Sequence, residues 1–400
     1  MRVVMVSDVY FPRINGVSTA ISTYRRALAA HGVEARLVAP DYGHNRDAGE
    51  AWITRVAARP VPRDPEDRLV RWRAMHAAVE RAVAEGCDLI HVQTPFVAHY
   101  AGLAAARRAG VPLVATYHTL FEEYLGHYAP FVPASWLRAL ARTFSRRQCN
   151  ALDAVIVPSR AIAQRLQAYG VRVATHILPT GIPLPSSLPG APARDVFRQR
   201  FGIAPQRPVA LFVGRVAHEK NIGFLLDVVE LARLERPDLL LLVAGEGPAL
   251  PALQRSVATR GLQANVQFIG YLDRERELPA CYAAADAFVF ASRTETQGLV
   301  LLEAMAVGLP VVALARMGTC DILDAGRGAL VPDDDAHAFA RALLRLLGDQ
   351  RLRAQLGAQA GAYAREWSDD ALAGRLAALY RGLVAAPRAA RSLALNPGTR

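Results

Sequence analysis

The feature that most constrains the fold is an alternation of short apolar runs with helical patterns, and the chain contains two series of it. In the first series, apolar runs such as residues 3–7 and 88–93 are followed by segments with helical periodicity. The second series begins at residues 209–215 and reaches the run at 310–315. Strands that alternate with helices in this way are typical of parallel sheets. We therefore expect the α/β class, with two domains that each contain a parallel, doubly wound sheet.

The length of the chain fits two domains. Its 400 residues exceed the usual size of a single core. We expect an N-terminal domain over residues 1–182 and a C-terminal domain over residues 207–368. Residues 183–206 are rich in proline, glycine and serine near their start, which favours a linker that leads into the second domain. A helix at about 369–385 is expected to pack back on the first domain, and residues 387–400 to form a mobile tail.

The composition is that of an ordinary soluble globular protein, with 52% hydrophobic and 21% charged residues. The opening run MRVVMVSDVYFP is interrupted by Asp8, which favours a first buried strand over a signal peptide. No run has the uncharged length needed to span a bilayer. The four cysteines lack metal-ligand spacing, so we expect reduced thiols in a cytoplasmic protein and no metal site.

Positive charge is concentrated in the first half of the chain. The net charge is +11, and residues 1–180 hold 22 arginines against 14 acidic residues. Nucleic acid, an anionic membrane surface or an acidic substrate would each explain this excess. A compositional drift toward arginine would explain it as well, since Lys220 is the only lysine in the chain.

The stretch ETQGLVLLEAMAVGLPVV, which begins at Glu295, joins an apolar run to a helical segment through a polar loop. Open α/β sheets bind ligands at such loops, at the carboxyl ends of their strands. Glu295 in the loop and Glu303 one turn into the helix could accept hydrogen bonds from sugar hydroxyls. Gly298, Leu299 and Val300 offer backbone N–H groups to a phosphate. A solvated loop acid and a surface helix acid would fit the same pattern.

A second loop of this kind, GRVAHEKN, starts at Gly214 and lies between a strand and a helix. Arg215 and Lys220 could converge there on a diphosphate, the arginine as a planar fork and the lysine as a point charge. A single lysine retained at this position in an arginine-rich chain favours anion binding. The alternative is a solvated lysine that survived by chance.

Two further loops are weaker candidates. Gly16 precedes a helix, where a glycine allows close backbone approach to a ligand, although it also suits a plain turn. The full G-x-G-x-x-G dinucleotide motif is missing, so a nicotinamide cofactor is disfavoured. His118 ends the run PLVATYH and is either a ligand contact or a structural hydrogen bonder. No nucleophile-and-base or metal cluster is visible in the pattern.

Several motifs occur together, and their combination resembles a known family. They are NGV at residues 15–17, GRxxxEKN at 214–221, AGEGP at 244–248, FIGY at 268–271 and the spaced pair Glu295 and Glu303. The combination resembles the retaining glycosyltransferases of the GT-B fold, often called group 1. The resemblance implies two Rossmann-like domains that face a deep cleft, a nucleotide-sugar donor as co-substrate, and neither metal nor cofactor.

By position, the resemblance also implies roles for individual side chains. Arg215 and Lys220 would bind the donor diphosphate and stabilise its departure, since no metal cluster would carry the charge. Glu303 would bind the ribose and Glu295 the transferred sugar. His118 would contact the hexose.

Further donor contacts are implied for a set of glycines and their neighbours: Gly16, Gly214, Gly270, Tyr271, Gly298, Leu299 and Val300. Two departures from the family pattern bear on the substrates. Met317-Gly318-Thr319 and Asp321 stand where the family often has two glycines and a glutamate, and Pro183 replaces the usual acid after the interdomain motif.

The segment HTLFEEYLGHY, which begins at His118, is most similar to the branch that glucosylates diacylglycerol. The helix expected at 134–151 supports a membrane surface independently. Its apolar residues recur every fourth position and its arginines follow one position along: Trp136, Leu140 and Phe144, then Arg138, Arg142 and Arg146, with Arg147 beside them. Such a basic amphipathic helix can lie on anionic lipid. An ordinary core-facing helix with solvated arginines is the alternative.

These observations lead us to expect a retaining, metal-independent hexosyltransferase that moves glucose from UDP-glucose to a lipid such as diacylglycerol. It would be cytoplasmic and peripheral on the inner face of the plasma membrane. A GDP-mannose-dependent α-mannosyltransferase is the alternative within the family, and a non-catalytic nucleotide-sugar-binding protein is the alternative outside it. Nucleic acid is disfavoured as a partner, because the basic helix lacks an aromatic stacking platform.

Overall fold

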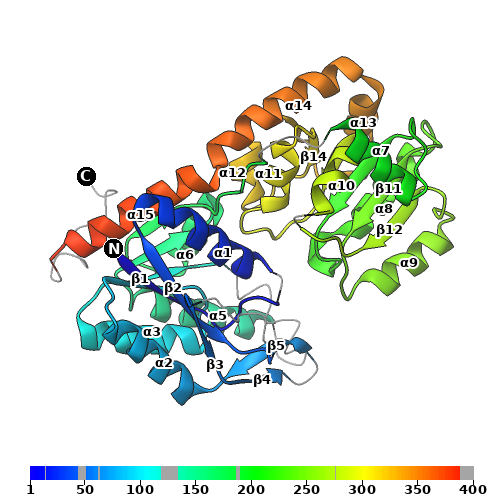
Figure 1. Cartoon of the computed structure of the whole chain (residues 1–400). Coiled ribbons are helices and arrows are strands. Elements are labelled where there is room, and N and C mark those ends of the chain that lie inside the picture. Colours follow the sequence, from blue (N-terminus) through cyan, green and yellow to red (C-terminus); the bar gives the residue numbers. More distant parts are fainter. Residues whose placement is uncertain are drawn as a thin grey trace. The chain divides into compact units, whose positions relative to one another are not determined.

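The computed structural model describes residues 1–13, 15–43, 51–61, 64–118, 134–185, 190–274 and 276–387. The chain forms two compact units, each drawn with its own sheet in Figure 1. Unit 1 combines Met1–Pro183 with Asp369–Arg400, and unit 2 is Leu184–Ser368. The tail expected at 387–400 lies, from residue 388 onward, outside the described residues.

Unit 1 is built on a seven-stranded sheet in the order β3-β2-β1-β6-β7-β8-β9. All neighbouring strands in it run parallel. The strands are β1 (Arg2–Val6), β2 (Glu34–Pro40), β3 (Ile53–Val56), β6 (Leu89–Val92), β7 (Leu113–Thr116), β8 (Ala154–Val157) and β9 (Thr175–Ile177). A separate antiparallel pair is formed by β4 (Ala58–Val61) and β5 (Asp64–Val70).

The helices of unit 1 include one from the far end of the chain. They are α1 (Gly16–Leu28), the short η1 (Ala29–His31), α2 (Trp72–Ala84), α3 (Val97–Ala109), α5 (Ala134–Cys149), α6 (Arg160–Ala168) and α15 (Asp369–Ala385). Helix α15 lies beside α1 (Figure 1), and both contribute to one hydrophobic core through residues such as Tyr24 and Leu376. Tyr380 of α15 is fully buried, and its hydroxyl lies 2.5 Å from His91 Nδ1 of β6. The last helix is therefore part of the core of unit 1.

Unit 2 contains a six-stranded parallel sheet in the order β12-β11-β10-β13-β14-β15. Its strands are β10 (Val209–Val213), β11 (Leu240–Ala244), β12 (Val266–Gly270), β13 (Ala287–Phe290), β14 (Val311–Ala313) and β15 (Ala329–Leu330). Its helices are α7 (Ala191–Arg200), η3 (His218–Lys220), α8 (Ile222–Ala232), α9 (Leu250–Thr259), α10 (Leu278–Ala284), α11 (Leu299–Ala306), α12 (Thr319–Leu323), α13 (Ala336–Gly348), α14 (Gln350–Ala364) and η4 (Arg365–Trp367).

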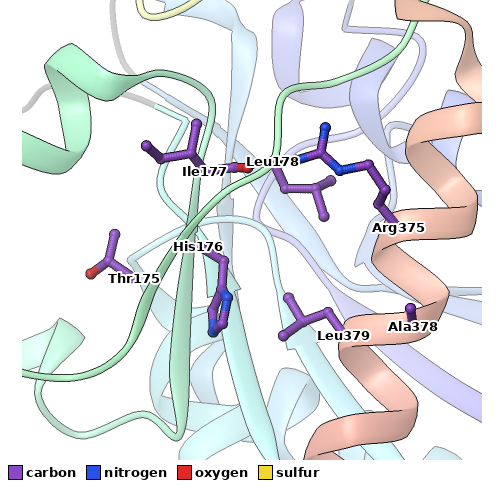
Figure 2. Close-up of a pocket in the computed structure, with 7 residues that line it drawn as sticks. All are labelled: Thr175, His176, Ile177, Leu178, Arg375, Ala378 and Leu379. Atoms are coloured by element: carbon purple, nitrogen blue, oxygen red, sulfur yellow. Dashed lines mark hydrogen bonds between the residues drawn. The ribbon is translucent and has the colours of Figure 1, made fainter. Parts of the chain in front are cut away.

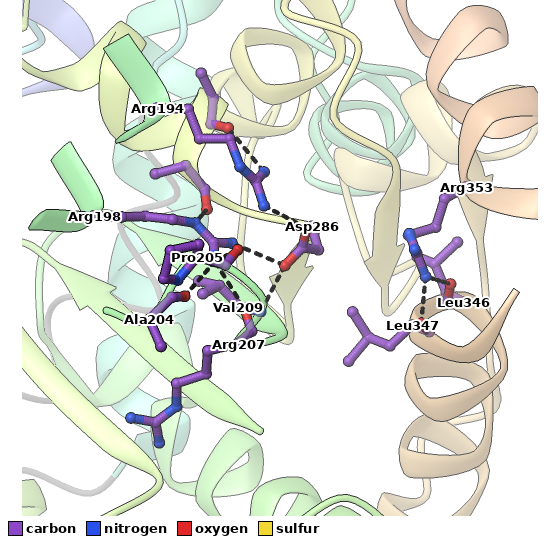
Figure 3. A network of polar contacts seen from close by, with 12 residues as sticks. Arg194, Arg198, Ala204, Pro205, Arg207, Val209, Asp286, Leu346, Leu347 and Arg353 are labelled. Carbon is purple, nitrogen blue, oxygen red and sulfur yellow. Dashed lines mark hydrogen bonds and ion pairs between the residues drawn. The ribbon is translucent and has the colours of Figure 1, made fainter. Parts of the chain in front are cut away.

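A buried arginine fastens helix α7 to the sheet of unit 2 (Figure 3). The guanidinium of Arg198 donates to Asp286 Oδ2 at 3.1 Å and to the carbonyl of Ala284 at 2.9 Å. It also donates to three carbonyls of the segment that leads into β10, those of Ala204, Pro205 and Arg207. The side chain is only 2% exposed, so the guanidinium has lost its hydrogen bonds to water. The protein acceptors replace those hydrogen bonds and offset the cost of burying the charge.

In both sheets the order of strands reverses once, between β1 and β6 in unit 1 and between β10 and β13 in unit 2. Such reversal points are where open α/β sheets bind ligands, at the carboxyl ends of the strands. The predicted pair of Rossmann-like α/β domains is confirmed. The reversal points also show where a site should be sought in each unit.

Candidate active site

Two loops of unit 2 are joined where its strand order reverses. Asn221, after β10, donates from Nδ2 to the carbonyl of Ala291, after β13, at 3.1 Å. The hydroxyl of Ser292 donates back to the carbonyl of Glu219 at 3.0 Å. Asn221 begins helix α8 with φ of 55°, in the left-handed region that asparagine tolerates better than most residues. These contacts fix the two loops that carry the predicted lysine and glutamate.

Lys220 and Glu295 form an ion pair between Nζ and Oε1. Their side chains are 22% and 16% exposed, so the pair is partly withdrawn from water. The two residues lie 75 positions apart in the chain, and the reversal of strand order brings them together. A cation therefore lies directly beside a carboxylate that could bind a neutral sugar.

The amino end of helix α11 follows the Glu295 loop. Gly298 precedes the helix with φ of 95°, and an added Cβ would lie 3.0 Å from Thr319 Cγ2, so a side chain there would be strained. The backbone N–H groups of Leu299 and Val300 belong to the first turn, where no acceptor within the helix is available. These N–H groups are therefore available to an anion.

Gly318 supports the same loop and was not predicted as a site residue. Its N–H donates to the carbonyl of Glu295 at 2.8 Å. An added Cβ would lie 2.0 Å from the carbonyl oxygen of Thr296, which leaves no room for a side chain. The departure Met317-Gly318-Thr319 from the family pattern thus keeps a glycine at a position that cannot accommodate a side chain.

Arg215 stands on a tightly packed edge formed by the loops after β10 and β11. The N–H of Val216 donates to the carbonyl of Glu246 at 2.9 Å. Gly245 and Gly247 allow this packing, since a Cβ on Gly247 would lie 2.4 Å from the carbonyl oxygen of Val216. The side chain of Arg215 is exposed and forms no ion pair within the described residues. The guanidinium is therefore accessible to an anionic ligand.

Glu303 is held in a small polar cluster on α11. Its side chain is 12% exposed, accepts a hydrogen bond from the Tyr282 hydroxyl at 3.1 Å, and pairs with Arg274. Burial raises the pKa of Glu303, and the nearby Arg274 opposes that shift. Burial also raises the pKa of the Tyr282 phenol. Arg274 was not predicted, although a basic residue three positions after Tyr271 on a strand-end loop was the available signal.

The remaining predicted donor residues of unit 2 lie at the end of β12. Gly270 has φ of 72°, and its carbonyl accepts from the N–H of Gly245 at 2.8 Å. Tyr271 follows and is 52% exposed. This places an aromatic face on the same edge as the Gly214 loop, since β12, β11 and β10 are neighbours.

In unit 1, Gly16 opens helix α1, and the side chain of Asn15 caps that helix by accepting from the N–H of Ser18 at 2.8 Å. Nothing lies within 4 Å of an added Cβ on Gly16, so packing within the unit does not require the glycine. His118 follows β7, and its Nε2 lies 2.9 Å from Gln93 Oε1. Burial lowers the pKa of His118 to about 4, so the imidazole is neutral at pH 7.

Asp8 occupies the reversal point of unit 1 and was predicted only as part of the first strand and its exit. Its carboxylate accepts from the Thr94 hydroxyl at 2.8 Å and from the N–H of Ala98 at 3.1 Å, at the start of α3. Burial raises the pKa of Asp8 to about 6, against these hydrogen bonds. The signal that could have found these residues is their place after buried strands, since Asp8 stands two residues after β1 and Gln93 directly follows β6.

Of the three apolar residues predicted to recur along helix α5, two are exposed, whereas Phe144 is half-buried. Trp136 is 74% exposed and Leu140 is 63% exposed. Arg142, Arg146 and Arg147 are exposed as well, with the Arg142 guanidinium 5.7 Å from the ring centroid of Tyr169. The side chain of Arg138 lies outside the described residues. The described part of α5 thus presents tryptophan, leucine and arginine to solvent.

A hollow of about 480 Å³ lies elsewhere in unit 1, between β9 and α15 (Figure 2). Its lining is Thr175, His176, Ile177, Leu178, Arg375, Ala378 and Leu379. Arg375 crosses it to donate to the carbonyl of Ile177 at 3.3 Å. None of the predicted site residues lines this hollow.

Two properties of the described residues concern metals and membranes. They contain no group of three or more His, Cys, Asp or Glu side chains that could hold a metal ion. Across the same residues, no helix combines the length and the apolar character needed to cross a bilayer.

Comparisons with known proteins agree with this geometry. The family described as glycosyl transferases group 1 matches residues 193–363, and glycosyltransferase family 4 matches residues 14–185. An alpha-monoglucosyldiacylglycerol synthase of Streptococcus pneumoniae is 33% identical over 78% of this chain and 71% of its own. A GDP-mannose-dependent alpha-mannosyltransferase of Mycobacterium tuberculosis is 30% identical over 92% of this chain and 93% of its own.

Solved structures show the same fold. The sucrose-phosphate synthase of Thermosynechococcus elongatus has a TM-score of 0.77 at 24% identity, over 96% of this chain and all of its own. Anabaena Alr3699/HepE in complex with UDP-glucose has a TM-score of 0.75 at 19% identity, over 96% of this chain and 99% of its own. The motifs, the two doubly wound sheets and these matches together show that the chain belongs to the group 1 glycosyltransferases, enzymes of the GT-B fold.

Proposed function

We propose that the protein is a retaining hexosyltransferase that moves glucose from UDP-glucose to a lipid acceptor such as diacylglycerol. The observation that carries the proposal is the arrangement in unit 2, where Lys220 pairs with Glu295 immediately before the amino end of α11. The Lys220 ammonium can bind a phosphate, the Glu295 carboxylate can accept hydrogen bonds from a sugar, and the N–H groups at the start of α11 can bind an anion. The names of the S. pneumoniae and Acholeplasma laidlawii relatives, both alpha-monoglucosyldiacylglycerol synthases, support the choice of sugar and acceptor.

In this proposal the donor diphosphate lies between Arg215, Lys220 and the first N–H groups of α11. Negative charge grows on the phosphate as the bond to the sugar breaks. Positioned cations and N–H groups therefore stabilise the transition state more than the ground state. Lys220 turns from Glu295 toward the phosphate when the donor binds, and Glu295 then accepts hydrogen bonds from the hexose hydroxyls.

The ribose is bound by Glu303. Arg274 and Tyr282 contact this carboxylate in the structure, and the ribose hydroxyls replace them when the donor binds. Arg274 is 40% exposed and can move away without leaving a buried charge. The exposed ring of Tyr271 and the Gly270 backbone then lie beside the base.

Transfer proceeds on one face of the sugar. The bond from the anomeric carbon to the phosphate oxygen breaks, a bond from the same carbon to the acceptor oxygen forms, and the acceptor proton passes to the departing phosphate. Retention follows because both bonds lie on the same face. The protein supplies the charge that stabilises the phosphate, and His118 contacts the hexose as a neutral imidazole.

The lipid acceptor is reached at the inner face of the plasma membrane, where α5 contacts anionic lipid. Exposure of Trp136 and Leu140 supports this, because large apolar side chains on a solvent-facing helix are otherwise unfavourable. Each exposed arginine near an anionic surface contributes about 1 kcal/mol. Arg142, Arg146 and Arg147 together are therefore sufficient for reversible, salt-sensitive binding.

A GDP-mannose donor is the second candidate. The observation in its favour is the M. tuberculosis relative, a GDP-mannose-dependent alpha-mannosyltransferase that aligns over 92% of this chain. Melting temperatures measured with UDP-glucose, UDP-galactose, GDP-mannose, UDP and GDP separate the two, because the true donor stabilises the fold most. Transfer of labelled hexose to diacylglycerol in anionic vesicles then tests the acceptor. Absence of stabilisation by every nucleotide sugar would reject the proposed function.

A further inference from the structure

Gln93 lies where the strand order of unit 1 reverses. It directly follows β6, and its backbone N–H donates to the carbonyl of Val6 in β1 at 2.8 Å. Its side chain is 1% exposed although it stands at the carboxyl edge of the sheet, where α/β sheets bind ligands. Gln93 therefore lies where ligand-binding residues are found in such sheets, although it is as buried as a core residue.

One end of the Gln93 carboxamide holds His118. The oxygen Oε1 lies 2.9 Å from His118 Nε2, and β6 and β7 run side by side to bring them together. A carboxamide oxygen only accepts hydrogen bonds, so Nε2 carries the proton of the neutral ring and Nδ1 keeps a lone pair. Burial lowers the pKa of His118 to about 4, which keeps the ring neutral at pH 7. His118 thus offers an acceptor at Nδ1.

A neighbouring histidine shows what a purely structural role looks like in the same unit. His91 uses both ring nitrogens, Nδ1 with the Tyr380 hydroxyl at 2.5 Å and Nε2 with the Thr116 hydroxyl at 2.7 Å. Within the described residues His118 has a partner at Nε2 but none at Nδ1. The two histidines therefore differ in the one respect that a substrate contact requires.

The other end of the Gln93 carboxamide is an unused donor. Gln93 Nε2 is buried and has no hydrogen-bond partner among the described residues. Gln148, also buried in unit 1, provides a contrast, because its Nε2 donates to the carbonyl of Pro95 at 2.6 Å. Buried polar groups are nearly always hydrogen bonded, so an unused donor at the ligand-binding edge indicates an acceptor supplied by a ligand.

We propose that Gln93 both positions His118 and binds the sugar, with Oε1 fixing the Nε2–H tautomer and Nε2 donating to a hexose hydroxyl. This inference rests on the proposed function, in which His118 contacts the hexose. A sugar hydroxyl both donates and accepts, so an acceptor at His118 Nδ1 and a donor at Gln93 Nε2 are complementary to hydroxyls on adjacent carbons. A phosphate, which only accepts, would match the donor alone.

The positioning role is tested on the full chain labelled with ¹⁵N-histidine. The His118 signals are identified by their loss in His118→Gln, and we expect the neutral Nε2–H form at pH 7. Gln93→Met keeps the length of the side chain and removes the amide, so the Nε2–H form should lose its dominance. Gln148→Met removes a buried amide elsewhere in the unit and should leave the His118 signals unchanged. An unaltered tautomer in Gln93→Met would overturn the positioning role.

The sugar contact is tested with Gln93→Glu, assayed at pH 8 to keep His118 neutral. The glutamate retains an oxygen for His118 and lacks the N–H, so it separates the two roles. We expect kcat to fall about 10-fold or more in Gln93→Glu and further in Gln93→Met, as expected for a lost hydrogen bond to a substrate hydroxyl. The Kd for UDP, which has no hexose, should stay within about twofold of wild type, because neither variant alters a group that UDP contacts.

Outcomes for the two proposals can be told apart. Wild-type kcat retained in both Gln93 variants would overturn the sugar contact while leaving the proposed function intact. If the wild type transfers no sugar from any donor, the proposed function fails and the sugar contact fails with it. The tautomer measurement needs no turnover and decides the positioning role in either case.

Discussion

Replacing Lys220 with methionine removes one positive charge and keeps most of the length of the side chain. A unit charge 4 Å from an anion contributes about 4 kcal/mol at an effective dielectric constant of 20. If that interaction develops only in the transition state, its loss lowers the rate by roughly 10³-fold. The Lys220 side chain is 22% exposed, and solvent screens part of the interaction. We therefore expect kcat to fall about 10²-fold to 10³-fold, as it does when one preorganised donor is removed.

The assay measures kcat at saturating donor, together with the melting temperature of each variant. Lys220→Met also leaves Glu295 without its cation, so Glu295→Gln and the double variant complete a cycle that separates the loss of the pair from the loss of catalysis. Lys220→Arg keeps the charge and should lose less activity than Lys220→Met. A folded Lys220→Met protein with kcat within about twofold of wild type would refute the role of this residue at the leaving group.

Three further predictions concern stability and membrane binding. Arg198→Met should lower the free energy of unfolding by about 3–5 kcal/mol in urea, because a partly buried carboxylate loses one of its two arginines and several carbonyls lose their donor. Arg200→Met, at a 58% exposed side chain, should change it little, and equal effects would contradict the role of Arg198. Burial raises the pKa of Asp8 from 3.8 to about 6, so the folded state binds the proton more tightly than the unfolded state. The free energy of unfolding of wild type, measured relative to that of Asp8→Asn, should therefore fall by up to about 3 kcal/mol as the pH rises from about 4 to about 6. A difference between the two proteins that does not change with pH would contradict the raised pKa of Asp8. Flotation with vesicles should show binding to anionic but not neutral lipid, weakened when Trp136 and Leu140 are both replaced by serine; equal binding by the variant would reject the membrane role of α5.

The fold could be predicted because buried parallel strands are continuous apolar runs. Strand β10 (Val209–Val213) and strand β13 (Ala287–Phe290) are completely buried, and their sequences contain no polar side chain. The loops that follow such strands were then the natural places to look for ligands, which led to Lys220 and Glu295. The structure shows these two in contact, although periodicity alone could not place one beside the other.

The partners of the predicted residues could not be derived from local pattern. Arg274 and Glu303 are 29 positions apart, and Gln93 and His118 are 25 apart. Each pair is joined only by the register and order of the strands between them, which periodicity does not reveal. Glu303 was expected to bind a ribose, and in the structure Arg274 and Tyr282 contact its carboxylate, because a buried carboxylate needs compensation.

The packing of Gly318 against the Glu295 loop could not be predicted from the sequence either. Gly318 appeared only as a departure from a family pattern, and its importance lies in a carbonyl 2.0 Å from where its side chain would begin. Contacts of this kind depend on the distance between two loops. A residue type alone, such as a glycine in a polar stretch, does not indicate that distance.

The proposed function depends on binding of the donor diphosphate by Arg215, Lys220 and the amino end of α11. The most direct test of this binding is to measure, by calorimetry, the Kd values of a nucleoside diphosphate and of the matching monophosphate. The base is uracil or guanine, whichever diphosphate raises the melting temperature more. We expect wild type to prefer the diphosphate, and Arg215→Met and Lys220→Met each to reduce this preference about 10-fold or more, since each removes one charge-assisted contact. If both variants keep the wild-type preference, the diphosphate is bound elsewhere and the account is contradicted.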